Sequence, residues 1–378
     1  MRRPLVYVAG VPWDGVQGTD HRLVEHLIDR PILWVDPIRP YQPKTAGRSF
    51  SKRGRAQIAT LAEIRPNLWR LAVTGPPAAT RLPVRRFARM MTTLAISRAI
   101  NALQLGAVDV ICANPMWTFG SIPAGRRIFF ATDDFIAGAS LMGLSARHLL
   151  SMWNRTVQDA DVVVAVSPTL AERAKPSGVD VRVLPNGCAP ERFKDAPPTP
   201  SVELTRPIAG VIGQMNERLD LQLLEEVADS GASLLLVGPK TLRDSGSALR
   251  FDRLVAHKHV QWVGLVPYES VPGFAAAMDV GLTPYCDDDF NQASFPLKTL
   301  EYLSAGLPVV STDLPSARWL QTPRVHVCAR DEFVGAVSEE LRRGLVPGGR
   351  EASLAVAEQN SWKSRANELG AILDEFSF

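Results

Sequence analysis

A lysine and a glutamate three residues apart have the types and the spacing to bind a nucleotide. They are Lys298 and Glu301, in the segment FPLKTLEYLSAGLPVVST at 295–312. On a helix, this spacing puts both side chains on one side, near the end where exposed amides carry partial positive charge. The amides and the lysine can bind phosphate, and the carboxylate can accept hydrogen bonds from vicinal hydroxyls such as those of a ribose. The alternative is an ordinary surface ion pair.

The residues around this pair predict the helix that carries it. Ser294 suits the N-cap, because its hydroxyl can accept a hydrogen bond from a first-turn amide. Pro296 suits the first turn, which needs no amide donor, and Gly306 predicts the end of the helix. The valines at 309–310 indicate a buried strand, so we expect the helix to lie between two strands.

Length and cysteine content limit the class of protein. A chain of 378 residues is long enough for two domains. Its four cysteines are scattered without a CxxC pair, which favours free thiols in a reducing, cytoplasmic compartment and argues against structural zinc. No run of about 20 apolar residues could span a bilayer. The apolar start at 5–11 is short and lacks a cleavage-like segment, so it predicts a first strand rather than a signal peptide.

Charge is distributed unevenly along the chain. Residues 1–199 hold 26 Lys and Arg against 15 Asp and Glu, a net +11, whereas residues 200–378 hold 16 against 24, a net −8. The basic front half indicates an anionic partner, and nucleic acid is disfavoured because aromatic residues are not interleaved with the basic ones. The segment 81–100 combines arginines with apolar residues. It is typical of a helix at the inner face of an anionic membrane, and the alternative is a helix with a basic solvent face.

Apolar runs alternate with helical stretches in both halves, which predicts two Rossmann-like α/β domains with doubly wound parallel sheets. The runs lie at 5–11, 32–36, 108–113, 127–132, 161–167 and 181–187, and again at 208–213, 233–238, 260–264, 279–285 and 309–312. We expect an N-terminal domain at 1–196, a proline-rich linker at 197–207, a C-terminal domain at 208–360, and an amphipathic helix at 361–378 that packs back across the domains. Ligands of such sheets bind beyond the carboxyl ends of the strands, so we expect a central cleft there.

Five segments in a fixed order carry a family resemblance. They are DADVVVAVSPTL (159–170), VRVLPNGCAPERF (181–193), IAGVIGQMNERLDLQLL (208–224), HVQWVGLVPYESVPGFAAAMDVGLTPY (259–285) and the helix segment at 295–312. Each motif is weak alone, but the ordered set is fairly specific. The chain resembles the GT-B glycosyltransferases, in particular the group 1 (family 4) enzymes of bacterial polysaccharide and cell-envelope synthesis. Within these it is similar to the teichuronic-acid and xanthan-assembly subgroup.

The resemblance implies that the C-terminal domain binds a nucleotide-sugar donor. Glu301 would accept hydrogen bonds from the ribose hydroxyls, and Lys298 and Arg218 would hold the diphosphate. These cations would replace a divalent metal, so no metal or other cofactor is expected. For Arg218 the alternative is an ion pair with Asp220 or a neighbouring acid.

Further donor contacts are implied in the same way. The amides near Gly213 and Ser294 would support the phosphates, Val266 would hold the base through its main chain, and Tyr285 would contact the base or a phosphate. One position departs from the family pattern: retaining members usually carry a second glutamate eight positions before the ribose-binding one, and here that position is Ala293. The departure leaves the stereochemical outcome open.

The loop after the first predicted strand is expected to face the acceptor. It spans 9–22, and its glycines, Gly10 among them, let a ligand approach the backbone closely. Trp13 and Asp14 lie in this loop as further acceptor contacts. His21 is either a ligand-facing base or part of the first turn of a helix. The loop lacks GxGxxG spacing, so Asp36 after the second strand is weak support for a dinucleotide site.

Two adjacent aspartates are candidates for the general base. Asp133 and Asp134 follow the predicted strand at 127–132, which places them at a carboxyl end. An inverting transfer needs a base to deprotonate the acceptor hydroxyl. One of the pair is expected to serve as this base, and the other to cap a turn.

The function predicted on these grounds is metal-independent transfer of a sugar from a nucleoside diphosphate, UDP being favoured, to a hydroxyl of a glycan, lipid-linked or small-molecule acceptor. A GT-B-shaped nucleotide-sugar epimerase and a non-catalytic nucleotide-sugar-binding protein are the alternatives. A nicotinamide-dependent oxidoreductase is disfavoured by the missing glycine fingerprint. The acidic run at 287–289 is expected to be a solvated loop rather than a metal site.

Overall fold

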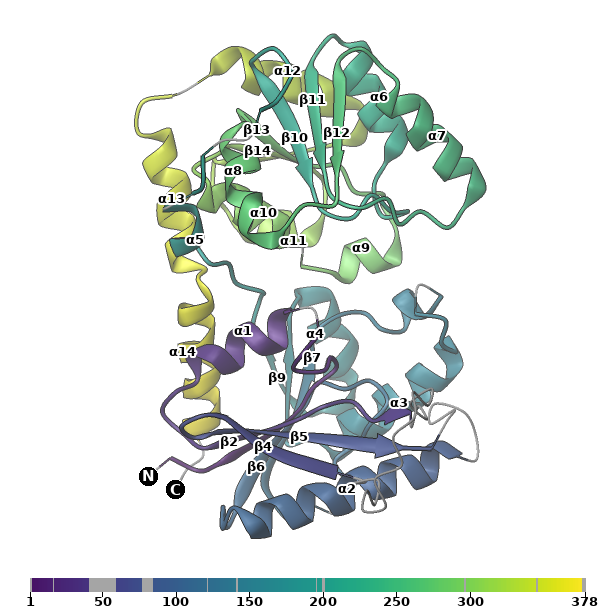
Figure 1. Ribbon diagram of the computed structural model, residues 1–378, viewed down its shortest axis with the longest axis vertical. Coiled ribbons are helices and arrows are strands. Elements are labelled where there is room, and N and C mark those ends of the chain that lie inside the picture. The colour runs from purple at the N-terminus through teal and green to yellow at the C-terminus, as the bar shows by residue number, and fades with distance from the viewer. Residues whose placement is uncertain are drawn as a thin grey trace, which may run out of the picture. The chain divides into compact units, whose positions relative to one another are not determined.

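The chain forms two compact units (Figure 1). The computed structural model describes residues 2–15, 17–40, 59–76, 84–120, 122–140, 142–194, 196–198, 201–295, 297–344 and 346–375. The N-terminal unit consists of Met1–Leu184 and Ala366–Phe378, and the C-terminal unit of Pro185–Arg365. Of the expected positions, 81–83, 195, 199–200, Pro296 and 376–378 lie outside the described residues.

The N-terminal unit contains a largely parallel sheet with the order β3-β5-β2-β1-β6-β7-β8-β9, to which β4 is added by antiparallel pairing with β5. The strands are β1 (Leu5–Val8), β2 (Ile32–Val35), β3 (Arg39–Pro40), β4 (Ala59–Arg65), β5 (Leu68–Gly75), β6 (Val108–Cys112), β7 (Ala124–Ala131), β8 (Val162–Ala165) and β9 (Asp180–Val183). Every residue of β1, β2, β6 and β8 is buried, as expected for strands covered on both faces. This confirms the predicted doubly wound class.

The β4–β5 hairpin was not among the strands predicted from the sequence. Its two-residue connection contains Asn67, whose φ of 64° lies in the left-handed region that Asn adopts more readily than most residues. Strand β4 is largely exposed, and β5 is fully buried only at Leu68, Leu71, Val73 and Gly75. Neither strand therefore has the continuous apolar run that marked the central strands.

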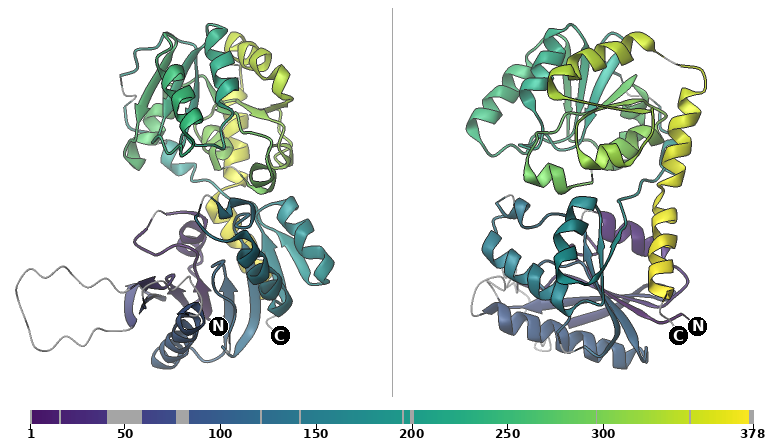
Figure 2. Two further views of the ribbon diagram at one scale, coloured as in Figure 1. Left: turned by 90° about the vertical axis from the view of Figure 1, so that its right-hand side faces the viewer. Right: turned by 180° about the vertical axis from the view of Figure 1, so that it is seen from behind.

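The helices of the N-terminal unit are α1 (Thr19–His26), α2 (Val84–Ala102), α3 (Ala146–Asp159), α4 (Pro168–Ala174) and most of α14 (Trp362–Asp374), with short 3₁₀ turns at Ala137–Ala139 and Lys175–Ser177. Helix α2 packs along β5 (Figure 2). It buries a stripe of small and β-branched residues at helical spacing, from Ala88 to Ile100. Its opposite side exposes Phe87, Met90 and Leu94. None of the described helices is both long and apolar enough to cross a membrane.

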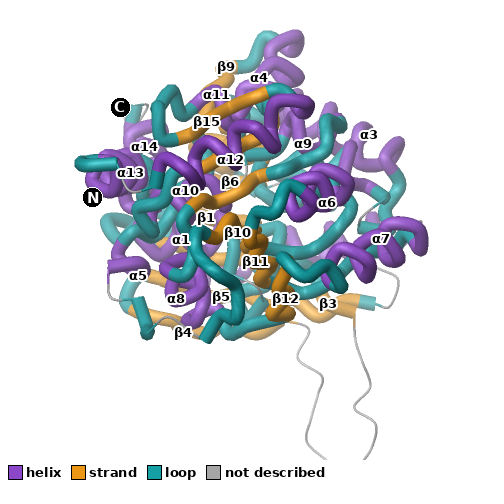
Figure 3. Tube along the Cα trace, turned by 90° about the horizontal axis from the view of Figure 1, so that it is seen from above, coloured by secondary structure: helices purple, strands orange, loops and turns teal. Residues whose placement is uncertain are grey.

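The C-terminal unit is a wholly parallel sheet with the order β12-β11-β10-β13-β14-β15, of which Figure 3 shows β10, β11 and β12 side by side. The strands are β10 (Ile208–Ile212), β11 (Ser233–Val237), β12 (Val260–Gly264), β13 (Val280–Thr283), β14 (Val309–Thr312) and β15 (Val325–Cys328). Chain order reverses between β10 and β13. In such sheets a ligand binds beyond the carboxyl ends of the strands at this switch point.

Helices cover both faces of this sheet, and each face has its own cluster of buried apolar residues. The helices are α5 (Glu191–Lys194), α6 (Leu221–Asp229), α7 (Ser245–Val255), α8 (Val271–Ala276), α9 (Asp289–Ala293), α10 (Leu297–Ser304), α11 (Pro315–Trp319), α12 (Phe333–Arg343) and α13 (Gly349–Gln359), with 3₁₀ turns at Tyr268–Ser270 and Arg330–Glu332. Asp220 caps α6 by accepting a hydrogen bond from the amide of Leu223 at 2.9 Å.

The unit boundary differs from the expected one. It falls after Leu184 instead of at 197–207, and the proline-rich segment belongs to the C-terminal unit. Two contacts explain this: Cys188 exchanges backbone hydrogen bonds with Asn360 and Trp362, and Glu203 N donates to the side chain of Gln261. The final helix α14 likewise starts in the C-terminal unit and belongs to the N-terminal unit from Ala366 onward.

Candidate functional site

Helix α10 carries the Lys298–Glu301 pair at the switch point of the C-terminal sheet. Gly213, directly after β10, has a φ of 148°, and a Cβ built on it would lie 3.6 Å from Lys298 Cε. Lys298 Nζ donates to Glu301 Oε2 at 2.6 Å. Three of the expected donor residues, from two separate segments, therefore meet at the carboxyl end of β10.

The two charges of this pair are largely shielded from solvent, with side chains 28% and 15% exposed. Burial alone lowers the pKa of Lys298, but the carboxylate of Glu301 raises it more, so the net pKa lies above the usual lysine value. Lys298 therefore remains protonated and positively charged at neutral pH. The ion pair between Lys298 and Glu301, which was the alternative interpretation of the sequence, is present. It also holds both side chains in position for a ligand.

Arg218, from the loop between β10 and α6, is held by a set of specific contacts of its own. Its Nε donates to Asn291 Oδ1 at 2.9 Å, and its guanidinium lies 4.8 Å from the ring centre of Phe290 and 5.2 Å from that of Tyr285. The alternative partner, Asp220, instead pairs with Arg330 at 2.7 Å. Arg218 is thus oriented by aromatic faces and a buried amide.

Asn291 is a residue that the sequence analysis missed. It is fully buried, and its Nδ2 donates to the carbonyl oxygens of Arg218 and Cys286. Its own amide is capped by Asp288, at 2.7 Å, at the start of α9. The acidic run 287–289 is therefore a helix start rather than only a solvated loop. No group of three or more His, Cys, Asp or Glu suited to a metal ion occurs in the described part of the chain.

The remaining expected donor residues have varied surroundings. Tyr285 is partly buried, which raises its pKa, and its amide donates to Thr312 Oγ1 at 3.1 Å. Val266 packs, partly buried, against the apolar cluster on one face of the sheet. The expected N-cap role of Ser294 requires a correction. It ends α9, a helix that was not anticipated, and its hydroxyl donates to the carbonyl of Phe290 at 2.8 Å.

Two further residues hold this region in shape. Asn186 is buried, and its Nδ2 donates to the carbonyl of Phe295 at 3.0 Å, which fixes the chain just before α10. A Cβ on Gly238 would lie 1.8 Å from the carbonyl oxygen of Gly213, so only glycine fits there. The PNG sequence at 185–187 was a signal for Asn186, whereas no local pattern pointed to Gly238.

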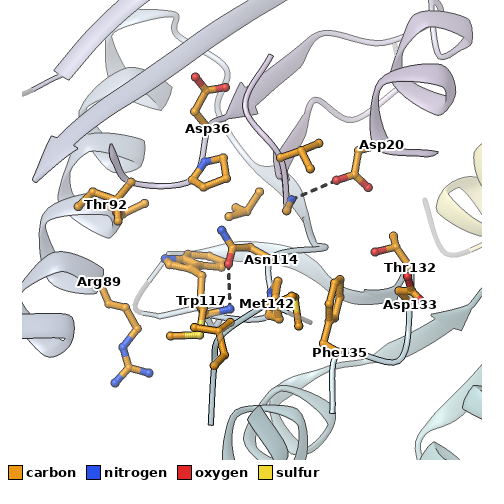
Figure 4. A pocket seen from close by; sticks show the side chains of 18 of the residues that line it. Asp20, Asp36, Arg89, Thr92, Asn114, Trp117, Thr132, Asp133, Phe135 and Met142 are labelled. Carbon is orange, nitrogen blue, oxygen red and sulfur yellow. Dashed lines mark hydrogen bonds between the residues drawn. The ribbon is translucent and has the colours of Figure 1, made fainter. Parts of the chain in front are cut away.

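The N-terminal unit has its own cavity, of about 460 Å³, beyond the carboxyl ends of β1, β6 and β7 (Figure 4). Chain order also reverses between β1 and β6, so this is the switch point of that sheet. Polar and apolar side chains surround the cavity. Those labelled in Figure 4 include Asp20, Asp36, Arg89, Asn114, Trp117, Thr132, Asp133, Phe135 and Met142.

Asp20, in the first turn of α1, is the carboxylate that the sequence analysis overlooked. It lines the cavity although it is almost wholly buried. Its oxygens accept hydrogen bonds from Tyr7 Oη at 2.8 Å and from Gly10 N at 3.1 Å. Burial raises the pKa of Asp20 to about 6, although both hydrogen bonds favour the ionised form. Asp20 thereby holds the glycine loop against β1.

The adjacent aspartates have different environments. Asp134 is buried and makes two hydrogen bonds with Arg173, at 2.7 and 2.6 Å, while its Oδ1 also accepts from the amides of Ile136 and Ala137. Burial opposes its charge, but these donors hold its pKa below the usual range. Asp133 lines the cavity, and its Oδ1 accepts from Asp134 N. The candidate base therefore narrows to Asp133, and Asp134 caps the turn.

Of the loop residues expected as acceptor contacts, Gly10 lines the cavity, as do its neighbours Val11, Gly18 and Thr19, whereas Trp13, Asp14 and His21 are not part of the lining. Trp13 packs against Trp34 and His21, and its amide donates to Asp36 Oδ1 at 2.8 Å. His21 is buried, with Nε2 3.1 Å from the carbonyl oxygen of Trp13, and burial lowers its pKa. It therefore belongs to the core of α1 and is poorly placed as a base.

Two further loop aspartates are held by arginines. Asp36 Oδ2 accepts from Arg70 at 2.6 Å, and Asp14 pairs with Arg70 and Arg39 at the surface. Both carboxylates thus shape the loop, and no dinucleotide-binding geometry arises from Asp36.

Comparison with known proteins independently supports the resemblance to glycosyltransferases. Residues 206–343 match the family described as Glycosyl transferases group 1. The putative teichuronic acid biosynthesis glycosyltransferase TuaH of Bacillus subtilis (strain 168) is 26% identical over 394 residues, with 94% of each chain covered.

Solved structures with a similar fold include sucrose-phosphate synthase from Thermosynechococcus elongatus, with a TM-score of 0.69 at 16% identity and 99% of each chain covered. Trehalose-6-phosphate from E. coli bound with UDP-2-fluoro glucose matches with a TM-score of 0.68 at 11% identity, also over 99% of each chain. A UDP-forming alpha,alpha-trehalose-phosphate synthase from Burkholderia xenovorans has a TM-score of 0.64 at 13% identity, over all of both chains. These matches show that residues 206–343 form a group 1 glycosyltransferase domain, and that the two parallel-sheet units share the GT-B fold of the solved structures.

Proposed function

We propose that the protein transfers a sugar from a uridine diphosphate sugar to a hydroxyl of a glycan, lipid-linked or small-molecule acceptor, without a metal ion. The carrying observation is the Lys298–Glu301 pair on α10, set against Gly213 at the switch point of the C-terminal sheet. Uridine is favoured because one structural neighbour is bound with UDP-2-fluoro glucose and another is UDP-forming.

On the donor side, the proposal assigns charge stabilisation to the C-terminal unit. The bond between the anomeric carbon and the β-phosphate oxygen breaks, and the leaving diphosphate gains negative charge. Lys298, which burial and Glu301 hold as a cation, and Arg218, which aromatic faces orient, stabilise this charge. Glu301 accepts hydrogen bonds from the ribose hydroxyls. These cations neutralise the negative charge of the leaving diphosphate, as a divalent metal does in other transferases.

On the acceptor side, the proposal assigns binding to the cavity of the N-terminal unit. The acceptor oxygen forms the new bond to the anomeric carbon, and its proton leaves to a base. Asp133 is the candidate base because it lines the cavity, whereas Arg173 keeps Asp134 ionised and occupied. Teichuronic acid synthesis, named for the Bacillus relative, supports a cell-envelope glycan as the acceptor class.

The proposal also includes contact with an anionic membrane through α2. Phe87, Met90 and Leu94 are each at least half exposed on this helix, and Arg86 and Arg89 lie among them. Apolar side chains flanked by arginines suit the boundary between headgroups and acyl chains. A peripheral location at the inner face of the cell membrane follows from this part of the proposal.

Calorimetric titration of UDP into the full chain tests the donor site. Glu301→Ala should weaken UDP binding about 100-fold, because two hydrogen bonds to a charged group are worth about 1.5 kcal/mol or more each. Glu339→Ala, which removes an exposed ion pair with Arg343 in the same unit, is the matched control and should bind UDP like the wild type. Asp133→Ala should also retain UDP binding. Equal affinities of the wild type and Glu301→Ala would reject the site.

A further inference from the structure

A groove of about 710 Å³ runs between α2 and α3 in the N-terminal unit. Its cationic lining is Arg85, Arg86 and Arg89 from α2 with Arg155 from α3, and His148 of α3 lines it as well. Arg89 Nη1 lies 3.2 Å from Met152 Sδ, so this side chain reaches from one helix to the other. No carboxylate is present among the described residues that line the groove. The groove therefore concentrates positive charge.

The charge is poorly compensated by the protein itself. Within the described ranges, Arg85, Arg86 and Arg89 form no ion pair. Arg155 lies 3.8 Å from Asp159, with side chains 64% and 42% exposed. Such an exposed contact contributes little. Burial and the nearby charges of Arg155, Arg85 and Arg86 lower the pKa of Arg89. An anion in the groove would relieve this repulsion.

Three buried nitrogens in the groove lining have no hydrogen-bond partner among the described residues. They are Arg85 Nε, His148 Nε2 and Trp117 Nε1. Trp117 is only 4% exposed, and its indole nitrogen can act only as a donor. An unpaired buried donor is costly, and the oxygens of an anion are acceptors that such donors lack here. The unpaired nitrogens therefore point to an anionic ligand independently of the positive charge of the groove.

We propose that the α2–α3 groove binds a phosphate or diphosphate group. Arginine side chains present planar pairs of donors that match phosphate oxygens, and the indole and imidazole nitrogens supply further donors. Inorganic pyrophosphate is the simplest ligand with this chemistry.

The groove also adjoins the cavity described above, because Arg85, Arg89 and Trp117 line both. Figure 4 shows Arg89 and Trp117 on the same side of that cavity. This step rests on the proposed function, in which the cavity holds the acceptor. The acceptor class is then a hydroxyl compound that carries a phosphate or diphosphate. Met90 and Leu94, which also line the groove, suit an apolar chain next to the phosphate.

Calorimetric titration of inorganic pyrophosphate into the full chain, with the donor site first saturated with UDP, tests the groove. Arg155→Gln and His148→Gln should each weaken pyrophosphate binding about tenfold, because each removes one charge-assisted contact. Arg98→Gln, a variant of α2 outside the groove, should bind like the wild type. Because Arg155 is mostly exposed, its substitution should not impair folding.

The imidazole of His148 gives a second readout. Its ring proton resonance, assigned by comparison with His148→Gln, should shift on addition of pyrophosphate to the wild type and to Glu301→Ala alike. Pyrophosphate binding with equal affinity in all variants, or an unshifted His148 resonance, would overturn the proposal. If UDP binds but pyrophosphate does not, the groove assignment fails and the donor site stands. If UDP does not bind but pyrophosphate binds, and binds more weakly to Arg155→Gln and His148→Gln, the donor site fails and the groove assignment stands.

Two further ligands distinguish the sources of the phosphate. Geranyl diphosphate carries an apolar chain, and glucose 6-phosphate carries a sugar. Tighter binding of geranyl diphosphate than of pyrophosphate supports a lipid-linked acceptor, and loss of that preference in Leu94→Ser locates the chain in the groove. Tighter binding of glucose 6-phosphate supports a soluble sugar phosphate. If neither ligand competes with pyrophosphate, the assignment of the groove to the acceptor is wrong.

Discussion

At the scale of single residues, environment separates side chains that look alike in the sequence. Asp133 and Asp134 are adjacent, yet one lines a cavity and the other is locked to Arg173. Asp20 and His21 are also adjacent. Asp20 lines the same cavity, and His21 packs against Trp13. In both pairs, the surrounding side chains decide which residue can meet a ligand.

The buried carboxyl of Asp20 should make the stability of the N-terminal unit depend on pH. Its pKa rises from 3.8 to about 6 on folding, so the native state holds the proton more tightly. This favourable contribution is complete below about pH 4 and is lost as pH rises through about 6. This loss is absent in Asp20→Asn, so the free energy of unfolding of the variant should rise by about 2.4 kcal/mol relative to that of the wild type between pH 4 and pH 7.

Urea unfolding at both pH values measures this difference, and taking the difference cancels the groups that the two proteins share. Asp331→Asn, an exposed carboxylate, should show the same pH dependence as the wild type. If Asp20→Asn also follows the wild-type profile, the carboxyl ionises in the folded protein as it does in the unfolded chain.

At the scale of elements, short segments set the geometry of the candidate site. Helix α10 has only eight residues, and its place depends on Asn186 before it and on Tyr302 within it. The hydroxyl of Tyr302 accepts from the amide of Ile212 at 2.7 Å, which ties the helix to the end of β10. Gly281 provides room for the same ring. These contacts hold Lys298 next to Gly213.

Helix α2 should carry the membrane contact if that part of the proposed function holds. Phe87 and Leu94 are 52% and 50% exposed, so replacing both with serine removes apolar contact without disturbing the core. The double variant Phe87→Ser/Leu94→Ser should bind phosphatidylglycerol vesicles at least about tenfold more weakly, because each inserted side chain is worth about 1.5 kcal/mol or more. Vesicle flotation measures the bound fraction.

Leu249→Ser is the control, since Leu249 is an exposed apolar residue of the C-terminal unit. High salt should release the wild type from these vesicles, because the arginines supply a screened attraction. A wild type that fails to float with anionic vesicles, or a double variant that floats equally well, would rule out this role for α2.

At the scale of the whole molecule, helix α14 packs into the N-terminal unit from Ala366 onward. In that unit, Arg30 donates to Asp374 at 2.8 Å, and Arg126 donates to the carbonyl of Ile372 at 3.2 Å. Leu369 and Leu373 are fully buried there. Residues from Ala366 onward thus belong to the N-terminal unit, although the whole C-terminal unit lies between them and the rest of that unit in the sequence.

This arrangement predicts that a substitution near the C-terminus destabilises the N-terminal unit. Leu369→Ala should lower its free energy of unfolding by about 2–5 kcal/mol, through lost burial and the cavity left behind. Asn367→Ala, on the exposed side of α14, should change it by less than about 0.5 kcal/mol. Amide hydrogen exchange in β1 and β6 reports on this unit. Unchanged protection there in Leu369→Ala would contradict the assignment of α14.

The sequence by itself determined the parallel sheets and the helix with Lys298 and Glu301. Continuous apolar runs such as those of β8 and β11 mark strands buried on both faces, and helical spacing fixes how two side chains on one helix lie. The family resemblance, carried by ordered motifs, was confirmed by the comparisons. Local patterns suffice here because each depends on residues close together in the chain.

The tertiary structure alone decided the hairpin of β4 and β5, the unit boundary at Leu184, and the surroundings of Asp20, Asn291 and the α2–α3 groove. The hairpin strands are too exposed for a clear apolar pattern, and the boundary depends on contacts of Cys188 with residues far along the chain. Burial, pKa and the pairing of charges arise between segments that no local pattern connects. The physical reason is that these properties depend on what surrounds a side chain, and the surroundings come from the whole fold.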